Sequence, residues 1–362
     1  MTFNKLFRPE PISACRAAFP EDPFSNLART LFDLQTCFEW GRTEAGYWDD
    51  AEQFLSYIDD AFEGQDPIKR TVLQDLLLHA TRPKPSGGVE HLSETGKTRL
   101  LQDMHIHARR ALAAQCSRFL LFRKPEKEEV WLPFRKWATS LDAKTDVILT
   151  FNYDCVLETL DPSAKHLQIL MPTEARDGAR VPVYKLHGSA DWVLVNGGEL
   201  QRVESPMHAL THQPQIIAIA APGRGKAEFV STHFENLWNR AEGELRTAGG
   251  VIVVGYGFPK TDSGATLRVL DAIREAEVID WVRELHVILG PDMGSSASIR
   301  VLALLQACTG GRDLIMTPAS SPVTGVHGHD RALRIKQHPL WSQDFLGDWV
   351  SRVRPVPEVT TK

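Results

Sequence analysis

Apolar residues recur at helical spacing through the first third of the chain. Two stripes show it, Leu27, Leu31, Leu34 and Phe38 and then Phe54, Leu55, Ile58 and Phe62. Such a stripe is what any helix needs to cover a core, so it indicates packing. A long helix is predicted from about Thr98 to Leu121, after a loop rich in proline and glycine. Residues 26–141 are therefore expected to be mostly helical.

The pattern changes after Asp146, where short apolar runs rich in strand formers begin. They cover residues 147–151, 183–186, 215–220, 250–254 and 285–289, and each is as compact as a strand buried on both faces of a parallel sheet. The helical segments 226–247 and 261–276 are long enough to be crossovers between such strands. Trp192–Val203, with Asn196-Gly197 in its middle, predicts a β-hairpin. The expected fold class is α/β, with a doubly wound, mostly parallel sheet and a largely helical N-terminal part.

A chain of 362 residues exceeds the size at which one hydrophobic core usually stops growing. We expect a mainly helical part over residues 1–141 that packs on the sheet, a sheet core over residues 142–310, and a C-terminal extension over residues 311–362.

Composition narrows the possible partners. The formal net charge of -5 gives no long-range attraction to a phosphate backbone, so nucleic acid is not an expected ligand. No apolar run approaches the roughly 20 residues of a membrane-spanning helix, and no signal-peptide pattern follows Met1. The five cysteines stand far apart, which indicates neither a disulfide framework nor a zinc site. A cytoplasmic protein with reduced thiols and no membrane contact is expected.

Polar residues follow three of the predicted strands. Asn152 and Asp154 come after the first, His187 after the second, and Gly255-Tyr256-Gly257 after the fourth. Ligands bind beyond the carboxyl ends of strands in doubly wound sheets, so these turns are expected to meet at one cleft. An amide, a carboxylate and an imidazole could orient a ribose hydroxyl or water and accept a proton.

Taken singly, each of these residues also has a structural explanation. Asn152 and Asp154 could cap the helix that Cys155–Leu160 predicts, and His187 could be a core histidine. The glycine pair lacks the full G-x-G-x-x-G pattern, and residues 222–226 do not form a Walker A loop. His105 and His107 would point to different faces of a helix and are interpreted as surface or core residues, so no metal site is predicted.

Three segments together resemble the signature of bacterial sirtuin-like domains. They are Ile148–Asp154, Lys185–Trp192 and Val253–Asp262, in the family's order and spacing, and Asp50–Ile58 resembles an early helix of the same family. The likeness covers about residues 45–310. It implies a Rossmann-like NAD site, with NAD or a related nucleotide as substrate and no metal.

The resemblance also implies roles for individual residues. Asn152 would position the nicotinamide ribose or the attacking water, Asp154 would face the carboxamide, and His187 would be the general base. The nucleotide contacts that it implies involve Thr150, Gly188, Ser189, Gly255, Tyr256, Gly257, Asp262 and Asp292. Members of this branch usually hydrolyse NAD to ADP-ribose and nicotinamide, often as regulated effectors of antiphage defence, so a homo-oligomer or a partner protein of a defence system is expected.

Two departures keep alternatives open. The family's glycine-rich phosphate loop has no counterpart in residues 1–50, where the first glycine is Gly41, so either the chain starts late or it binds the nucleotide differently. Relatives commonly have Asn where this chain has Gly290. The first alternative is a catalytically inactive scaffold or nucleotide sensor in a defence complex. A zinc-free deacylase is a weaker one.

Overall fold

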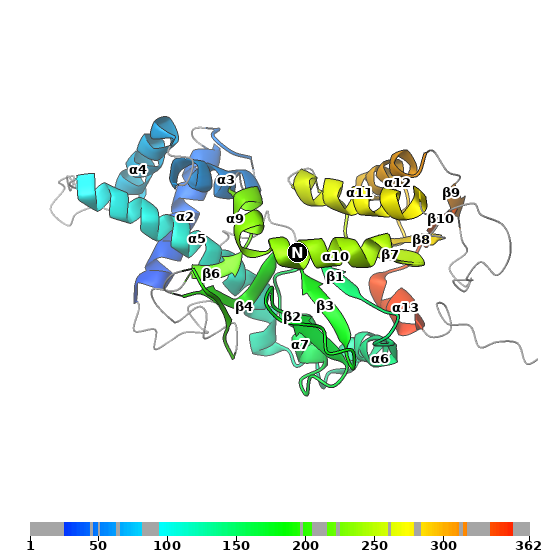
Figure 1. Cartoon of the computed structure of the whole chain (residues 1–362). Helices are drawn as coiled ribbons and strands as arrows, with labels where there is room; N and C mark the ends of the chain where they lie inside the picture. Colours follow the sequence, from blue (N-terminus) through cyan, green and yellow to red (C-terminus); the bar gives the residue numbers. More distant parts are fainter. Residues whose placement is uncertain are drawn as a thin grey trace, which may run out of the picture. The chain divides into compact units, whose positions relative to one another are not determined.

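The computed structural model describes residues 25–43, 46–49, 51–62, 66–81, 94–195, 198–204, 216–221, 225–259, 262–278, 284–310, 314–316 and 334–349. Helices and small, mostly parallel sheets make up an α/β architecture (Figure 1). None of the helices in these ranges is long and apolar enough to cross a membrane.

The chain forms two compact units, each assembled from separate stretches of sequence. The first unit takes Met1–Arg123, Asn152–Cys155 and Lys185–Phe234, and the second takes Lys124–Phe151, Val156–Tyr184 and Glu235–Lys362. The three domains expected along the sequence remain a prediction.

Helices dominate the first unit, as the apolar stripes predicted. They are α2 (Ser25–Thr43), α3 (Ala51–Phe62), α4 (Pro67–Thr81), α5 (Glu94–Phe122) and α9 (Lys226–His233). Helices α2 to α5 pack together, coloured blue to cyan in Figure 1, and α5 also packs on the sheet of this unit. Leu34, Phe54 and Ile58 are fully or almost fully buried there, so these stripe residues form the core. His105 and His107 on α5 are also buried, which decides between the surface and core interpretations in favour of the core.

The sheet of the first unit is antiparallel, in the order β5-β4-β6. Its strands are β4 (Gly188–Leu194), β5 (Leu200–Arg202) and β6 (Ile216–Ile219). The expected hairpin is confirmed, because Val193 pairs with Gln201 in an antiparallel register; its Asn196-Gly197 turn lies outside the described residues. The assignment of residues 215–220 to a parallel sheet is wrong. Strand β6 instead pairs antiparallel with the other edge of β4. The prediction failed because a local apolar pattern indicates burial but not the direction of the partner strand.

The second unit contains two sheets. One has the order β1-β3-β2, from β1 (Ile148–Thr150), β2 (Leu167–Leu170) and β3 (Val181–Lys185), with β2 and β3 parallel. The other has the order β7-β8-β10-β9 and is parallel throughout, from β7 (Gly250–Val254), β8 (Glu284–Ile288), β9 (Leu314–Met316) and β10 (Arg334–Gln337). Each apolar run predicted after Asp146 therefore forms a strand, although the described strands fall into three sheets.

The helices of the second unit are η2 (Glu129–Trp131), α6 (Leu132–Ser140), α7 (Val156–Leu160), α10 (Glu235–Arg246), α11 (Ser263–Val278), α12 (Ser296–Cys308) and α13 (Ser342–Gly347). The two predicted crossover segments are confirmed as helical, with residues 226–247 divided into α9 and α10 near Phe234. Helix α11 packs against both α10 and α12 (Figure 1). Ser295 caps α12 by accepting a hydrogen bond from the amide of Ser298 at 3.3 Å.

Candidate functional site

The turn that carries Asn152 and Asp154 is anchored by the residue between them. Tyr153 is buried, and its hydroxyl donates a hydrogen bond to the carbonyl oxygen of Ala220 at 2.8 Å. Its own carbonyl oxygen accepts a hydrogen bond from the amide of Ala190 at 2.8 Å. Asn152 is exposed and Asp154 is half-buried. The anchored tyrosine therefore fixes a turn on which Asn152 is exposed.

A buried lysine fixes the same turn from the other side. Lys185 is only 1% exposed, and its ammonium group donates hydrogen bonds to the carbonyl oxygen of Asp154 at 2.5 Å and to the hydroxyl of Ser189 at 2.6 Å. A charge-assisted hydrogen bond is stronger than a neutral one, and an ammonium group this deep needs such partners. Lys185 thus ties the Asp154 turn to the start of β4.

The charges at this turn shift the pKa of Cys116, a cysteine of α5. Burial and the negative charge of Asp154 raise the pKa of the Cys116 thiol to about 12, against the opposing effect of Lys185. The thiol therefore stays protonated at neutral pH. A protonated, buried thiol is a poor nucleophile, so Cys116 contributes packing to the core cluster that also contains Tyr153.

His187 lies between β3 and β4 and is 2% exposed. The Tyr153 ring faces its imidazole, with centroids 6.2 Å apart and planes 30° apart. The carbonyl oxygen of His187 accepts a hydrogen bond from the amide of Ala220 at 2.9 Å. The imidazole is therefore packed within the unit.

The glycine after His187 allows this packing. Gly188 has a φ of +82°, and a Cβ at this position would lie 2.0 Å from the carbonyl oxygen of Ala218 and 2.7 Å from the Phe234 ring. Only glycine fits, both for conformation and for space. Ser189 is fully buried and lies within 3.8 Å of the Cys155 sulfur. Gly188 and Ser189 are thus packed at the start of β4, and their contact with a nucleotide remains a prediction.

The first unit thus brings together five of the residues that the sequence singled out: Asn152, Asp154, His187, Gly188 and Ser189. Tyr153 and Lys185 connect them, and sequence reasoning gave neither a role. The signal for Lys185 was a charged residue inside the apolar run that precedes His187. Tyr153 offered no comparable signal, because an aromatic residue in a turn is as often exposed as buried.

The glycine turn after β7 belongs to the second unit. Gly255 has a φ of +69°, is exposed, and donates its amide hydrogen bond to the carbonyl oxygen of Ile288 at 2.9 Å. The Arg300 side chain of α12 donates to the carbonyl oxygen of Gly257 at 2.7 Å. This guanidinium therefore fixes the turn.

Aromatic and acidic side chains complete the turn. The Tyr256 ring stacks on Phe151, with centroids 4.1 Å apart and planes 13° apart. Its hydroxyl donates a hydrogen bond to the Asp262 carboxylate at 2.7 Å, and Asp262 is buried. Thr150 ends β1 in the same unit and is half-buried. The predicted residues Tyr256 and Asp262 are thus in direct contact with each other.

The segment around Gly290 is shaped by Trp341. Gly290 has a φ of +101°, and a Cβ there would lie 3.1 Å from the Trp341 ring. An asparagine at this position would meet both a strained backbone and a close aromatic ring. Asp292 is exposed, and its carboxylate accepts a hydrogen bond from the amide of Gly294 at 3.0 Å. The difference from the sirtuin-like pattern at Gly290 therefore has a packing reason.

Comparison of the chain with models of known protein families gives no match, and a comparison with curated proteins gives none either.

Proposed function

We propose that the chain is an NAD glycohydrolase that cleaves NAD to ADP-ribose and nicotinamide. One observation carries the proposal. The exposed amide of Asn152 and the half-buried carboxylate of Asp154 flank an anchored tyrosine whose ring faces the imidazole of His187. These are the residue types that the sirtuin-like resemblance assigns to this reaction, and the first unit holds them together.

The chemistry needs few groups. The bond between the ribose C1′ and the nicotinamide nitrogen breaks, and the electron pair leaves with nicotinamide. Water attacks the cationic C1′, forms the new C–O bond of ADP-ribose and releases one proton. His187 would accept that proton, Asn152 would orient the water or the ribose, and Asp154 would face the carboxamide. Lys185 would keep Asp154 in place.

In the second unit, the nucleotide contacts that the resemblance implies are proposed separately. The exposed Gly255, at positive φ, offers backbone without a side chain to a phosphate, and Tyr256 and Asp262 offer a hydrogen-bonded pair to a ribose. A Rossmann-like arrangement of the strands would go with this binding mode. Asp292, which is exposed, would contact the adenosine end.

A catalytically inactive scaffold or nucleotide sensor is the second candidate. The burial of His187 at 2% exposure, against the Tyr153 ring, favours it, because a general base must reach the water that it deprotonates. Under the first proposal, NAD binding would have to open a path from the attacking water to the His187 imidazole. A regulated enzyme that a partner protein or self-assembly activates would meet this requirement.

Nicotinamide release from NAD tests the proposal. Purified protein is incubated with NAD, alone and with the proteins that neighbouring genes encode, as wild type, Asn152→Ala and His187→Ala. His166→Ala, at an exposed histidine, is the matched control. Loss of a positioned acid–base group is expected to lower the rate at least about 100-fold, while the control keeps the wild-type rate. Equal release by all four proteins would remove the catalytic assignment, and saturable NAD binding without release would favour the sensor.

A further inference from the structure

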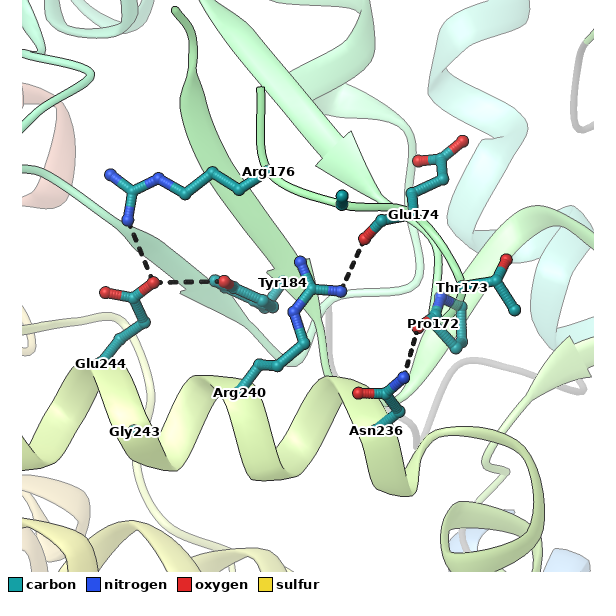
Figure 2. Close-up of a pocket in the computed structure, with 10 residues that line it drawn as sticks. Pro172, Thr173, Glu174, Arg176, Tyr184, Asn236, Arg240, Gly243 and Glu244 are labelled. Carbon is teal, nitrogen blue, oxygen red and sulfur yellow. Dashed lines mark hydrogen bonds and ion pairs between the residues drawn. The ribbon is translucent and has the colours of Figure 1, made fainter. Parts of the chain in front are cut away.

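A cavity of about 580 Å³ opens within the second unit, and none of the residues discussed above as site residues lines it. It lies between the segment that follows β2, the strand β3 and one face of α10 (Figure 2). Asn236, Arg240, Gly243 and Glu244 are spaced along α10 so that they share that face. Its volume falls within the range of small-molecule sites.

One pair of charges in the cavity is already neutralised. The Glu244 carboxylate accepts a hydrogen bond from the Arg176 guanidinium at 3.1 Å and another from the Tyr184 hydroxyl at 3.2 Å. Arg176 also donates to the carbonyl oxygen of Ala143 at 2.7 Å. The ion pair therefore forms a fixed wall of the cavity.

Arg240 differs, because its contacts are with neutral groups. Its guanidinium donates to the carbonyl oxygen of Glu174 at 2.7 Å and lies 5.2 Å from the centroid of the Tyr184 ring. The Glu174 carboxylate turns instead to the amide of Met171 at 3.0 Å. Figure 2 shows Arg240 projecting from α10 into the middle of the lining. Among the ten lining residues it is the cation without a carboxylate contact.

Two further features of α10 shape the cavity. Asn236 donates its amide hydrogen to the carbonyl oxygen of Pro172 at 2.8 Å, and in Figure 2 its amide oxygen lies on the Arg240 side. Gly243 lies within α10, where glycine is less favourable than alanine. A Cβ at Gly243 would meet nothing within 4 Å. Gly243 therefore lines the cavity without any packing need for glycine.

We propose that this cavity binds a small sugar phosphate. The phosphate would lie against the Arg240 guanidinium, whose fork of donors matches phosphate oxygens. The amide oxygen of Asn236 and the carboxylate of Glu244 would accept hydrogen bonds from sugar hydroxyls. Tyr184 holds the guanidinium from beneath, so the cation is positioned before the ligand arrives. This site is independent of the proposed NAD chemistry.

Isothermal titration calorimetry of the full chain with ribose 5-phosphate tests the site, with ribose as the uncharged control ligand. Ribose 5-phosphate is expected to bind, and ribose at least about tenfold more weakly, because it lacks the charged partner of Arg240. Arg240→Met is expected to weaken ribose 5-phosphate binding by a similar factor. Gly243→Phe is expected to abolish it by placing a ring against the cavity lining.

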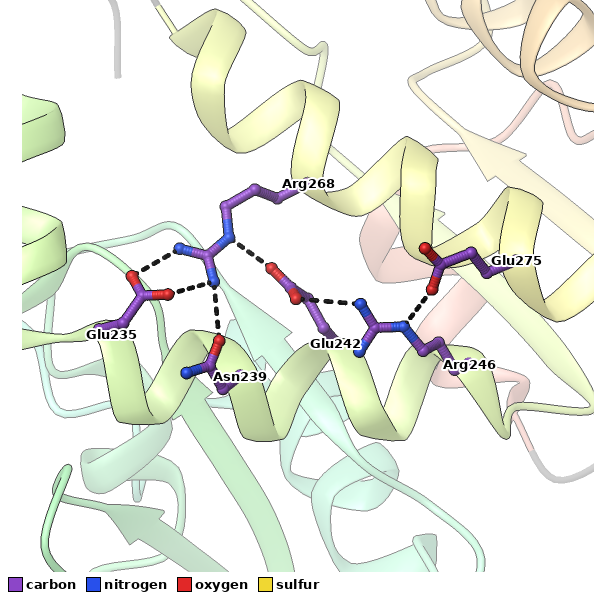
Figure 3. A network of polar contacts seen from close by, with 6 residues as sticks. All are labelled: Glu235, Asn239, Glu242, Arg246, Arg268 and Glu275. Carbon is purple, nitrogen blue, oxygen red and sulfur yellow. Dashed lines mark hydrogen bonds and ion pairs between the residues drawn. The ribbon is translucent and has the colours of Figure 1, made fainter.

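Arg246→Met is the matched control. Arg246 lies on α10 but pairs with Glu242 and Glu275 away from the cavity (Figure 3). Its loss is expected to leave the affinity unchanged. Thermal unfolding shows whether each variant folds. If Gly243→Phe does not fold, the affinity of Arg240→Met alone tests the proposed site. No binding by the wild type at millimolar concentration, equal affinity for ribose, or unchanged binding by Arg240→Met would each overturn the proposal.

Discussion

The ammonium group of the buried Lys185 donates a hydrogen bond to the backbone carbonyl oxygen of Asp154 across 2.5 Å. The two residues are far apart in sequence, and the bond fixes the turn that carries the candidate catalytic carboxylate. The same ammonium group holds Ser189 at the start of β4.

Replacing this lysine should therefore destabilise the fold. Lys185→Met removes both charge-assisted hydrogen bonds, which should lower the free energy of unfolding by about 1–3 kcal/mol. Urea denaturation measures the loss. Lys165→Met, at an exposed lysine, should change stability by less than about 0.5 kcal/mol. If both variants are as stable as the wild type, Lys185 does not hold the turn.

Two glycines at positive φ, Gly188 and Gly178, allow the cost of a steric clash to be measured separately from the cost of backbone strain. Gly188→Ala would suffer both, and we expect it to lose about 2–5 kcal/mol of stability. Gly178 has a similar φ of +71° but nothing within 4 Å of an added Cβ, so Gly178→Ala should lose only about 1–2 kcal/mol. Urea denaturation of the two variants gives the difference. Equal losses would show that the contacts with Ala218 and Phe234 yield to the new methyl group.

The buried His107 should make stability depend on pH. Burial, with a contribution from the nearby Arg110, lowers its pKa from 6.5 to about 4. Protonation then favours the unfolded chain, so this contribution to stability falls as pH drops from about 6.5 to 4 and is constant below that. One pKa unit corresponds to about 1.4 kcal/mol, so the loss is on the order of 3 kcal/mol.

Replacing this histidine checks the assignment. Within the described part of the chain, the Nδ1 atom of His107 is buried with no hydrogen-bond partner, so His107→Leu should be tolerated at pH 7. Its urea midpoint should vary less than that of the wild type between pH 6.5 and 4. His166→Leu, at an exposed histidine beside Asp161, should not flatten the pH profile. Parallel profiles for wild type and His107→Leu would rule out His107 as the source.

The charged network between α10 and α11 should stabilise the second unit in a salt-dependent way. Arg268 pairs with Glu235 at 2.9 Å and with Glu242, and it lies 4.7 Å from the centroid of the Trp238 ring (Figure 3). Arg268→Met should cost about 1–2 kcal/mol, since the network combines a bidentate ion pair with a cation–π contact. Thermal unfolding at low and at 1 M salt should show a smaller loss in high salt.

An isolated pair on α11 provides the comparison. Arg274 contacts Asp271 at 2.8 Å, and both side chains are more than half exposed. Arg274→Met should therefore change stability by less than Arg268→Met does, because solvent screens an exposed pair. Similar effects for the two variants would mean that the network adds nothing to its separate pairs.

The sequence by itself determined where the secondary-structure elements lie. Apolar spacing located α5, β7, α11 and the β4–β5 hairpin within a few residues, because helix and strand periodicity are local properties. It also singled out Asn152, Asp154 and His187, which one structural unit holds together.

Only the tertiary structure decided which strands pair and which polar groups are buried. The direction of β6 depends on β4, far from it in sequence, and the apolar run alone carries no information about that partner. Lys185, Tyr153 and His187 have ordinary polar or aromatic side chains in the sequence, and their burial comes from the elements that pack over them. The cavity beside Arg240 likewise exists only because α10 lies against β3. Strand pairing, the burial of these side chains and the cavity all depend on long-range packing, which a local sequence pattern does not encode.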